Sequence, residues 1–584
     1  LYIKMNARGK TLTNFETFKA LVEKHIGQRF PDPTAHELFG KPASRKQYFS
    51  HQIDTTWAEL FWTFRDKATN LFDARMMNLI RVTAIITRDP EDDEFEEILE
   101  ELREPVASLS FQKYLSNTCL DQPHIELLIL ILDALSGPNG AMRTYLPDKS
   151  YFNEKAAFRR IIIDGGGATY ADLIIFAAYA QVFEVHGEEL GGERFADWMR
   201  VVRNLTVNSN IERPDQFRRG LRSINGLLPE ADDILNFLIE NECKLGVFSL
   251  QQLREERIKA GLIRRSDRWK GAVLKAEQHG YFKGQIEFLL DFSGVLNAWK
   301  AESYCDWDPD EDDEYFEEFE SYFEKACLLF DRNGLINHGE FRTERALLAI
   351  GNYMFTRGQN HSFLENSDDP VSWKRLLRGE HFLNPGPRRG ILKTLLDEID
   401  VTSGISASLD RVIEDTEVAD DWRRVIVENP KLIEYCGKRQ IRYYADDNVY
   451  LLKGVRRSGK HVDLFSYQLF VTELSEMHTQ GGFAPFGPPR YCAVHTDSEE
   501  PGIRLHCKDG DELIHLLIWN KGSTFEIRLW SSADELPDDL KERCEERPGF
   551  EFNDGGELRL NVDISEVIGN LTLIVEAVRK YLDE

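Results

Sequence analysis

The 584-residue sequence has few cysteines, no long apolar run and a deficit of positive charge. Its eight cysteines are thinly scattered, unlike the dense pattern of a secreted disulfide framework, so we expect a reducing, cytoplasmic compartment. The longest apolar runs, at residues 127–135 and 174–183, fall short of the roughly 18 residues that a membrane-spanning helix requires. The sequence therefore predicts a soluble protein with no membrane segment.

The charge deficit limits the classes of ligand that composition alone would suggest. The chain has 72 Lys and Arg against 100 Asp and Glu, which gives a formal net charge of −28. A broad basic surface for nucleic acid is therefore not the default expectation. The hydrophobic fraction of 42% is ample for buried cores, which excludes global disorder. At about 150 residues per domain, the length indicates roughly three or four structural units.

The N-terminal segment starts within a strand-like pattern and not at a methionine. Apolar residues alternate over positions 1–5, and a turn-like tetrapeptide follows at positions 6–9. We therefore expect that an upstream part of the protein precedes Leu1. Thr13 and Glu16 have the spacing of a capping box, which predicts that a helix begins there.

Most of the chain from residue 44 to 435 has apolar residues at helical spacing. In residues 195–205 an apolar stripe occupies one face, and charged residues such as Arg200 occupy the other positions. Glu255 and Lys259 have the favourable i,i+4 spacing of a helical ion pair. We interpret the acidic stretch 306–320 as a solvated linker. The expected segments are a strand–turn–helix unit (1–43), two helical subdomains (44–305 and 306–437) and a C-terminal domain (438–584).

The C-terminal segment has a different pattern. Residues 441–452 and 502–530 are rich in aromatic and β-branched residues, and turn dipeptides stand at 509–510 and 521–522. A final helix is predicted over residues 565–582. The predicted fold class is mainly α, with a large helical body followed by a small α+β domain at the C-terminus.

A local basic patch in this domain is the first candidate for nucleic-acid binding. Nearby tyrosines could stack on bases while the cations neutralise phosphates. The alternative is a basic hairpin paired with acidic surfaces. The same segment has the spacing of a phosphate-binding loop, but His461 stands where a Ser or Thr would hold magnesium, so we favour a basic turn. The candidate residues are Lys453, Arg456, Arg457, Lys460 and His461.

Two further residue sets could hold a metal ion. Asp509, Asp511 and Glu526 could converge on magnesium in a nuclease, although turn acids and a surface ion pair explain them more simply. The second set is a candidate zinc site, but neighbours on a strand, such as His506 and Cys507, point to opposite faces. We therefore assign no metal site to this chain. The zinc candidates are Cys492, His495, His506, Cys507 and His515.

The opening segment resembles the closing motif of the ParB-like N-terminal domain of GmrSD-type restriction proteins. These are prokaryotic proteins associated with modification-dependent restriction and phage defence. Three later phrases are similar to a long branch of that family: FSxxIDxxW at 49–57, WMRVVRNL at 198–205 and ExHxYFxG at 277–284. On this resemblance, residues 1–43 are the tail end of a ParB-like domain. The matching motif residues are Asn6, Gly9, Thr13 and Glu16, which shape a turn and cap a helix.

The resemblance implies that nucleotide-dependent activity belongs to a part of the protein upstream of this chain. In the family, nucleotide-dependent activity is associated with an Asp-Gly-Gln-Gln-Arg-type motif upstream of the matching segment, and that motif is absent from this chain. Nucleotide and magnesium are therefore expected only for a full-length protein, and no cofactor is expected here. We expect the chain to support nucleic-acid recognition or regulation in a defence protein. DNA and a protein partner, or the N-terminal domain, are the candidate partners. The alternatives are a metal-dependent nuclease using C-terminal carboxylates and a non-enzymatic protein-binding scaffold.

Overall fold

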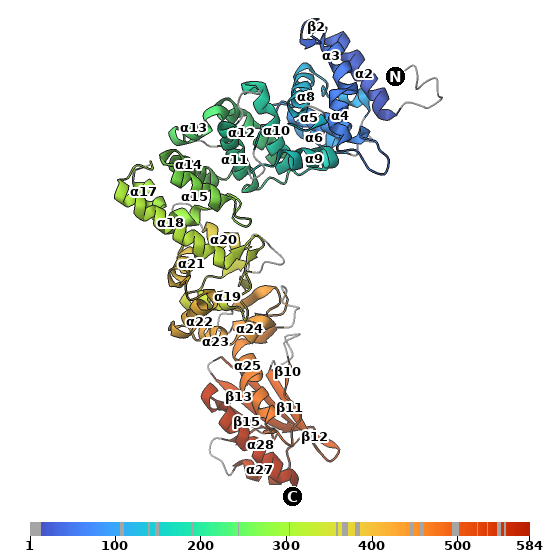
Figure 1. Ribbon diagram of the computed structural model, residues 1–584. Helices are drawn as coiled ribbons and strands as arrows, with labels where there is room; N and C mark the ends of the chain where they lie inside the picture. Colours follow the sequence, from blue (N-terminus) through green and yellow to red (C-terminus); the bar gives the residue numbers. More distant parts are fainter. Residues whose placement is uncertain are drawn as a thin grey trace. The chain divides into compact units, whose positions relative to one another are not determined.

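The structure is a computed structural model, and it describes residues 13–583 apart from short internal segments. The chain separates into two compact units, residues 1–316 and 317–584, which are described one at a time (Figure 1). The residues left out are 1–12, 105–109, 138–139, 147–150, 188–191, 243–244, 303, 358–359, 365–371, 380–385, 444–448, 455–460, 493–501, 523, 534, 546–549, 554–555 and 584.

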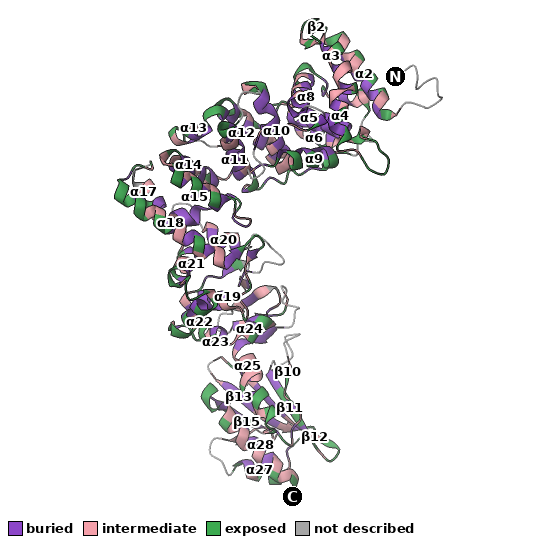
Figure 2. Ribbon diagram, in the orientation of Figure 1, coloured by how far each residue is buried: buried purple, intermediate pink, exposed green. Residues whose placement is uncertain are grey.

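The first unit is built from helices with one short hairpin, β1–β2. Residues 173–183 of α10 are almost all buried, because this helix packs against α8, α9, α11 and α12 (Figure 2). Its elements are α2 (Asn14–Arg29), β1 (His36–Leu38), β2 (Lys41–Ala43), α3 (Arg45–Asp54), α4 (Thr56–Trp62), α5 (Asp73–Ile86), α6 (Phe95–Arg103), α7 (Phe111–Ser116), α8 (Gln122–Leu135), α9 (Glu154–Asp164), α10 (Tyr170–His186), α11 (Glu193–Val207), α12 (Pro214–Leu227), α13 (Ile234–Glu240), α14 (Leu250–Arg265), α15 (Asp267–Glu277), α16 (Glu287–Phe292) and α17 (Val295–Glu302).

The start of α2 confirms the predicted capping box. The Thr13 hydroxyl accepts a hydrogen bond from the Glu16 backbone N–H at 3.1 Å, and the Thr13 N–H donates to the Glu16 carboxylate at 2.7 Å. The helix then buries its apolar stripe, including Phe18 and Ile26, against the unit. Asn6 and Gly9, the other two motif residues, lie outside the described residues.

The acidic stretch 306–320 is not a solvated linker, which corrects the prediction. Helix α18 (Pro309–Leu329) begins within it, and the Asp312 side chain is buried. Asp312 accepts hydrogen bonds from Trp269 Nε1 at 2.9 Å, Trp307 Nε1 at 2.7 Å and Arg265 Nε at 2.6 Å. Burial opposes the ionisation of Asp312, but bonds from Arg268, the two indoles and Arg265 outweigh it and lower its pKa to about 2.

The second unit combines helices with two antiparallel sheets. The five-stranded sheet has the order β5-β6-β7-β8-β9, and the six-stranded sheet has the order β10-β11-β12-β13-β15-β14. The elements up to the second sheet are β3 (Phe330–Asp331), β4 (Gly334–Leu335), α19 (Arg342–Ile350), β5 (Phe355–Arg357), β6 (Asn360–Ser362), α20 (Ser372–Arg378), α21 (Pro387–Glu398), α22 (Ile405–Asp415), α23 (Asp421–Glu428), α24 (Pro430–Tyr435), β7 (Gln440–Tyr443), β8 (Val449–Leu452), β9 (His461–Asp463), α25 (Leu464–Leu469) and α26 (Ser475–Thr479).

The six-stranded sheet buries one face against helices. Its inward side chains, such as Ile503, Ile518 and Ile527, form one apolar core with Leu571 and Ile574 of α28. The predicted turns at Gly510 and Gly522 join β11 to β12 and β12 to β13, and both glycines have a positive φ. The elements are β10 (Arg490–Cys492), β11 (Gly502–Asp509), β12 (Glu512–Asn520), β13 (Phe525–Ser531), α27 (Asp538–Glu545), β14 (Glu551–Phe552), β15 (Leu558–Val562) and α28 (Val567–Asp583).

The predicted fold class is confirmed: the chain is mainly α, with an α+β region at its C-terminal end. The final helix, predicted over 565–582, is α28. The sequence pattern did not reveal two strands, β5 and β6: β5 pairs with β6, and β6 pairs with β7, so both join the sheet that contains β8 and β9. Among the described residues, no helix is both long enough and apolar enough to cross a membrane.

Candidate functional site

The structure describes only the two ends of the predicted basic patch. Lys453 is exposed and its ammonium lies 5.6 Å from the Tyr435 ring centroid. His461, by contrast, is only 8% exposed and packs edge-on against Tyr450, so it does not belong to an exposed basic surface. Arg456, Arg457 and Lys460 lie outside the described residues.

The strands on either side of this segment argue against a phosphate-binding loop. Leu452 of β8 pairs with His461 of β9 in an antiparallel register, so β8 and β9 are consecutive antiparallel strands. A phosphate-binding loop instead leads from a strand directly into a helix whose N-terminus faces the phosphates. The order strand, connection, strand does not provide that geometry.

The carboxylates proposed for a nuclease do not converge. Asp509 pairs with Glu512 at one end of β12, whereas Glu526 pairs with Trp519 seven residues further along that strand. At about 3.4 Å per residue, the two positions are roughly 24 Å apart. They also lie on opposite faces of the sheet: Asp509 accepts a hydrogen bond from Tyr581 of α28, on the core side, and Glu526 lies on the other side.

The zinc candidates are separated in the same way. Cys507 is buried in the core under α28, and the adjacent His506 is exposed on the opposite face, as predicted for neighbours on a strand. His495 lies outside the described residues. Among the residues that are described, no group of three or more His, Cys, Asp or Glu side chains is arranged to hold a metal ion.

The face of the six-stranded sheet opposite α28 carries an unexpected concentration of cations. Cross-strand partners project from the same face, so the register Arg490–Arg504–Leu517–Arg528–Arg559 forms one row across five strands. Beside it, two residues along, stands the row His506–His515–Trp530. We call this surface the outer sheet face. Its members are Arg490, Arg504, His506, Lys508, His515, Leu517, Trp519, Glu526, Arg528, Trp530, Arg559 and Asn561.

Solvent reaches much of the outer sheet face. Arg490, Arg504, Lys508 and Arg559 are exposed, while Leu517 in the centre is buried beneath its neighbours. Within the described part of the chain, Arg490 and Arg504 have no ion-pair partner, whereas Arg559 pairs with Glu557 at 2.9 Å. Five cations therefore stand on this face with the carboxylate of Glu526, and Glu551 of β14 is the strand partner of Arg559, in a chain that is strongly acidic overall.

Glu526 organises one end of the face. It is 2% exposed and accepts hydrogen bonds from Lys521, Arg528 and Trp519 Nε1, the last at 3.1 Å. Burial raises its pKa, but the bonds from the two cations outweigh burial, and the net pKa is lowered. The Arg528 guanidinium also lies 5.2 Å from the Trp519 ring centroid. Glu526 is therefore an ionised anchor for these cations.

The aromatic row is stacked. The rings of His515 and Trp530 lie nearly parallel, with centroids 5.1 Å apart and an interplanar angle of 18°, and His506 lies 6.4 Å from His515. Burial first, and then the nearby His506 and Arg504, lower the pKa of His515. A neutral imidazole stacked on an indole presents an aromatic surface beside the arginine row.

A second concentration of charge is buried in the first unit, where two of the motif phrases meet. Arg200 of α11, which the helical pattern had grouped with the polar positions, is 0% exposed. Its Nη1 donates to Glu256 and to Glu277, at 2.9 Å in each case. Lys259 Nζ lies 3.0 Å from Glu255 and 2.7 Å from Glu277. These five residues are called the buried charge cluster.

Hydrogen bonds complete the buried charge cluster. Asn204 donates to Glu277 at 2.9 Å, and Lys259 donates to the Gly284 carbonyl at 2.8 Å. Gly284 has a φ of +84°, and an added Cβ would lie 2.1 Å from Asn204 Oδ1, so glycine is required there. The phrases WMRVVRNL and ExHxYFxG thus supply Arg200, Asn204, Glu277 and Gly284 to one buried network.

The cluster contains three carboxylates and two cations, and burial sets its protonation. Burial, only partly offset by Lys259, raises the pKa of Glu255 to about 7. Glu277 behaves oppositely: burial raises its pKa, but Lys259 and Arg200 outweigh burial, and the net pKa is lowered. Because the cluster is sealed from solvent, its ion pairs link α11, α14 and α15 and offer no surface to a substrate.

The third phrase also marks buried structure. Phe49, Ile53 and Trp57 are all less than 5% exposed, and Trp57 Nε1 donates to Asp133 at 3.0 Å. Asp54 forms an ion pair with Lys19 of α2. This phrase therefore ties α3 and α4 to α2 and α8.

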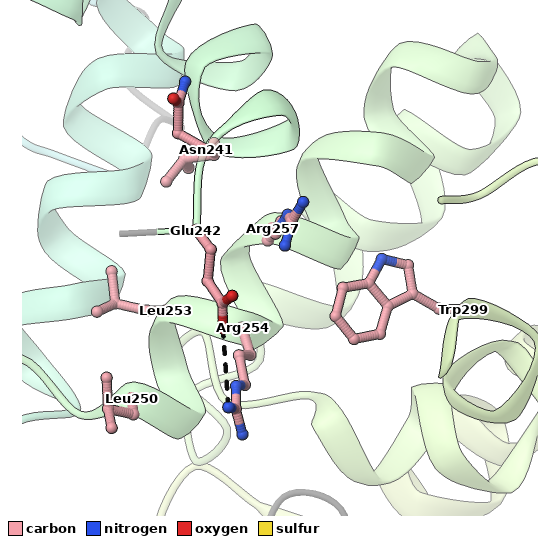
Figure 3. Close-up of a pocket in the computed structure, with 8 residues that line it drawn as sticks. Asn241, Glu242, Leu250, Leu253, Arg254, Arg257 and Trp299 are labelled. Atoms are coloured by element: carbon pink, nitrogen blue, oxygen red, sulfur yellow. Dashed lines mark ion pairs between the residues drawn. The ribbon is translucent and has the colours of Figure 1, made fainter. Parts of the chain in front are cut away.

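A small pocket lies between α13, α14 and α17 in the first unit (Figure 3). Arg254 pairs with Glu242 at 3.9 Å across its mouth, and Arg257 donates to the Ile239 carbonyl. Its volume of about 50 Å³ holds only a few water molecules. It is lined by Leu238, Asn241, Glu242, Leu250, Leu253, Arg254, Arg257 and Trp299.

The outer sheet face was missed by the sequence analysis, although a signal was present. Arginine, histidine and lysine occupy alternate positions at 504, 506 and 508, and Arg528 and Trp530 repeat the pattern on β13. Such alternation predicts one basic face, but only the strand register brings the segments together. Searches against family models, curated proteins and solved structures find no match for this chain.

Proposed function

We propose that the chain is the helical and C-terminal part of a GmrSD-like prokaryotic defence protein, and that it binds nucleic acid through the outer sheet face. The motif phrases support the family, and the row of four arginines supports the ligand. A concentrated basic surface is unexpected in a chain with a net charge of −28, which favours a polyanionic ligand for it. DNA is the ligand expected from the resemblance.

Two arginines of this face have no ion-pair partner among the described residues, which favours ligand binding over internal pairing. Arg490 and Arg504 are exposed and, among the described residues, have no carboxylate partner. Phosphate contacts by such arginines release counterions, so binding would weaken steeply as salt concentration rises. The helices of the chain would support the six-stranded sheet and couple it to a protein partner. The proposal includes no cleavage reaction, because Asp509 and Glu526 are far apart.

The test is fluorescence polarisation of labelled DNA with the full chain, measured between about 50 and 200 mM salt. The decisive variant is Arg490→Glu with Arg504→Glu. We expect an affinity loss of at least tenfold and a salt slope shallower by about 1.4 to 1.8, as for two lost phosphate contacts. A separate double variant, Arg456→Glu with Arg457→Glu, tests the sequence-based candidate.

The matched control changes the charge by the same amount elsewhere in the second unit. Lys431 on α24 and Lys580 on α28 are exposed, and neither belongs to the outer sheet face. Lys431→Glu with Lys580→Glu should retain most of the affinity. If Lys431→Glu with Lys580→Glu lost as much affinity as Arg490→Glu with Arg504→Glu, the loss would reflect overall charge and not the outer sheet face. No binding by the unaltered chain at low salt would overturn the proposal and favour a protein-binding scaffold.

A further inference from the structure

We infer that the outer sheet face binds an unpaired nucleic-acid strand, with bases stacked on the His515–Trp530 pair and phosphates along the arginine row. The inference rests on the proposed function and specifies its ligand. It concerns single-stranded DNA or RNA as one class, because both offer unstacked bases and phosphates.

The width of the surface argues against reading a duplex. From Arg490 on β10 to Arg559 on β15 the arginine row crosses four strand spacings, about 19 Å at ~4.8 Å each. The major groove of DNA is about 12 Å wide and admits one helix or a two-stranded ribbon. A sheet of this width stays outside the groove, and its aromatic rings do not reach paired bases.

The two rows have complementary roles for an unpaired strand. His515 and Trp530 stand two residues along their strands from Leu517 and Arg528, a separation of about 7 Å. Cations and aromatic rings therefore alternate across the surface. Base stacking on aromatic side chains tolerates any sequence, and the adjacent cations neutralise the backbone.

The other tryptophan of the outer sheet face, Trp519, already has contacts within the protein at its ring and its indole N–H. Trp519 donates to Glu526, and its ring lies 5.3 Å from Lys521 Nζ and 5.2 Å from the Arg528 guanidinium. These contacts hold Trp519 at the edge of the face. Trp530, stacked only on its His515 side by the described ring contacts, is the stacking residue.

The test compares labelled ligands of about 20 nucleotides, longer than the ~4–16 nucleotides that one sheet platform covers. The ligands are a DNA strand, an RNA strand of the same sequence, the DNA duplex, and a DNA strand with abasic sites. We expect the unpaired strands to bind at least tenfold more tightly than the duplex. The abasic strand should lose about tenfold, the effect of one missing stack.

Trp530→Ala should lower the affinity for the intact strand about tenfold and leave the affinity for the abasic strand unchanged. His506→Ala, at an exposed position, is the second variant should Trp530→Ala fail to fold, with a smaller loss expected. The abasic comparison uses the unaltered chain and so does not depend on either variant. Duplex binding as tight as strand binding, or an abasic strand that binds like the intact one, overturns the inference. If Arg490→Glu with Arg504→Glu still weakens both ligands, the proposed function survives that outcome.

Discussion

The buried charge cluster and the outer sheet face contain similar residues in opposite surroundings. In the cluster, Arg200 and Lys259 are 0% exposed and each contacts at least two carboxylates. On the sheet, Arg490 and Arg504 are exposed and, within the described residues, meet no carboxylate. A buried cation needs a carboxylate partner to offset the loss of its hydration, whereas an exposed cation is hydrated by water and remains available to bind a ligand. The motif phrases thus supply residues to a buried network, whereas the exposed arginines of the sheet are the ones that we propose bind a ligand.

The largest expected effect comes from unpairing the buried charge cluster. Arg200→Met would leave Glu256 and Glu277 with one fewer cation in a sealed site, so we expect a loss of about 3–5 kcal/mol in the free energy of unfolding. Urea denaturation measures this loss. Arg194→Met removes the same charge from an exposed position of α11 and should change stability by less than about 0.5 kcal/mol. Similar losses in both variants would contradict the comparison.

The next effect concerns the buried carboxylate of Asp312, which accepts hydrogen bonds from four side chains. Asp312→Asn should cost about 1.5–3 kcal/mol, because hydrogen bonds to charged groups are lost. The lowered pKa means that this stabilisation is complete above the ordinary value of 3.8 and disappears as the pH falls towards about 2. The neighbouring Asp313 has a side chain that is 64% exposed, and Asp313→Asn is the matched control with little expected effect.

An effect that depends on pH should follow from Glu255→Gln. Because the folded-state pKa of Glu255 is raised to about 7, the unfolded chain loses this proton first, and the unfolding free energy falls as the pH rises from about 4.5 to 7. The glutamine cannot ionise and leaves two cations facing two carboxylates. We expect the stability of the variant to equal that of the unaltered chain near pH 4.5 and to exceed it by about 3 kcal/mol at pH 8, since each unit of pKa shift corresponds to about 1.4 kcal/mol. Parallel pH profiles for the two proteins would exclude the raised pKa.

Local patterns predicted the parts of the fold that local interactions determine. The capping box at Thr13 needs only residues within one helical turn, and the glycine turns at 510 and 522 need only the backbone conformations of those hairpins. The apolar stripe of α11 was equally readable, because burial follows from a period of 3.6 residues. Each of these features was predicted correctly.

Features that depend on distant partners were not predictable in this way. Arg200 reads as a polar helix position, and its partners are 56 and 77 residues away. Asp312 lies in an acidic run that reads as solvated, but its arginine and tryptophan partners come largely from the preceding helices. The basic patch at 453–461 attracted attention because its cations are adjacent in sequence. The arginines of the outer sheet face are adjacent only through the register of five strands.

The smallest expected effect is a pH dependence of nucleic-acid binding that the buried charge cluster cannot produce. A phosphate beside His515 would raise its pKa in the complex, so binding should be fully strengthened below its free pKa and lose that gain as the pH rises through the bound pKa. We expect roughly threefold tighter binding at about pH 6 than at pH 8, measured by polarisation at constant salt. His506→Asn with His515→Asn should remove the difference, whereas His478→Asn, on α26, should retain it. Because the raised pKa of Glu255 makes the free energy of unfolding depend on pH in the same range, each affinity is measured at a temperature at which the protein remains folded. A difference that persists in the double variant would place its origin outside the outer sheet face.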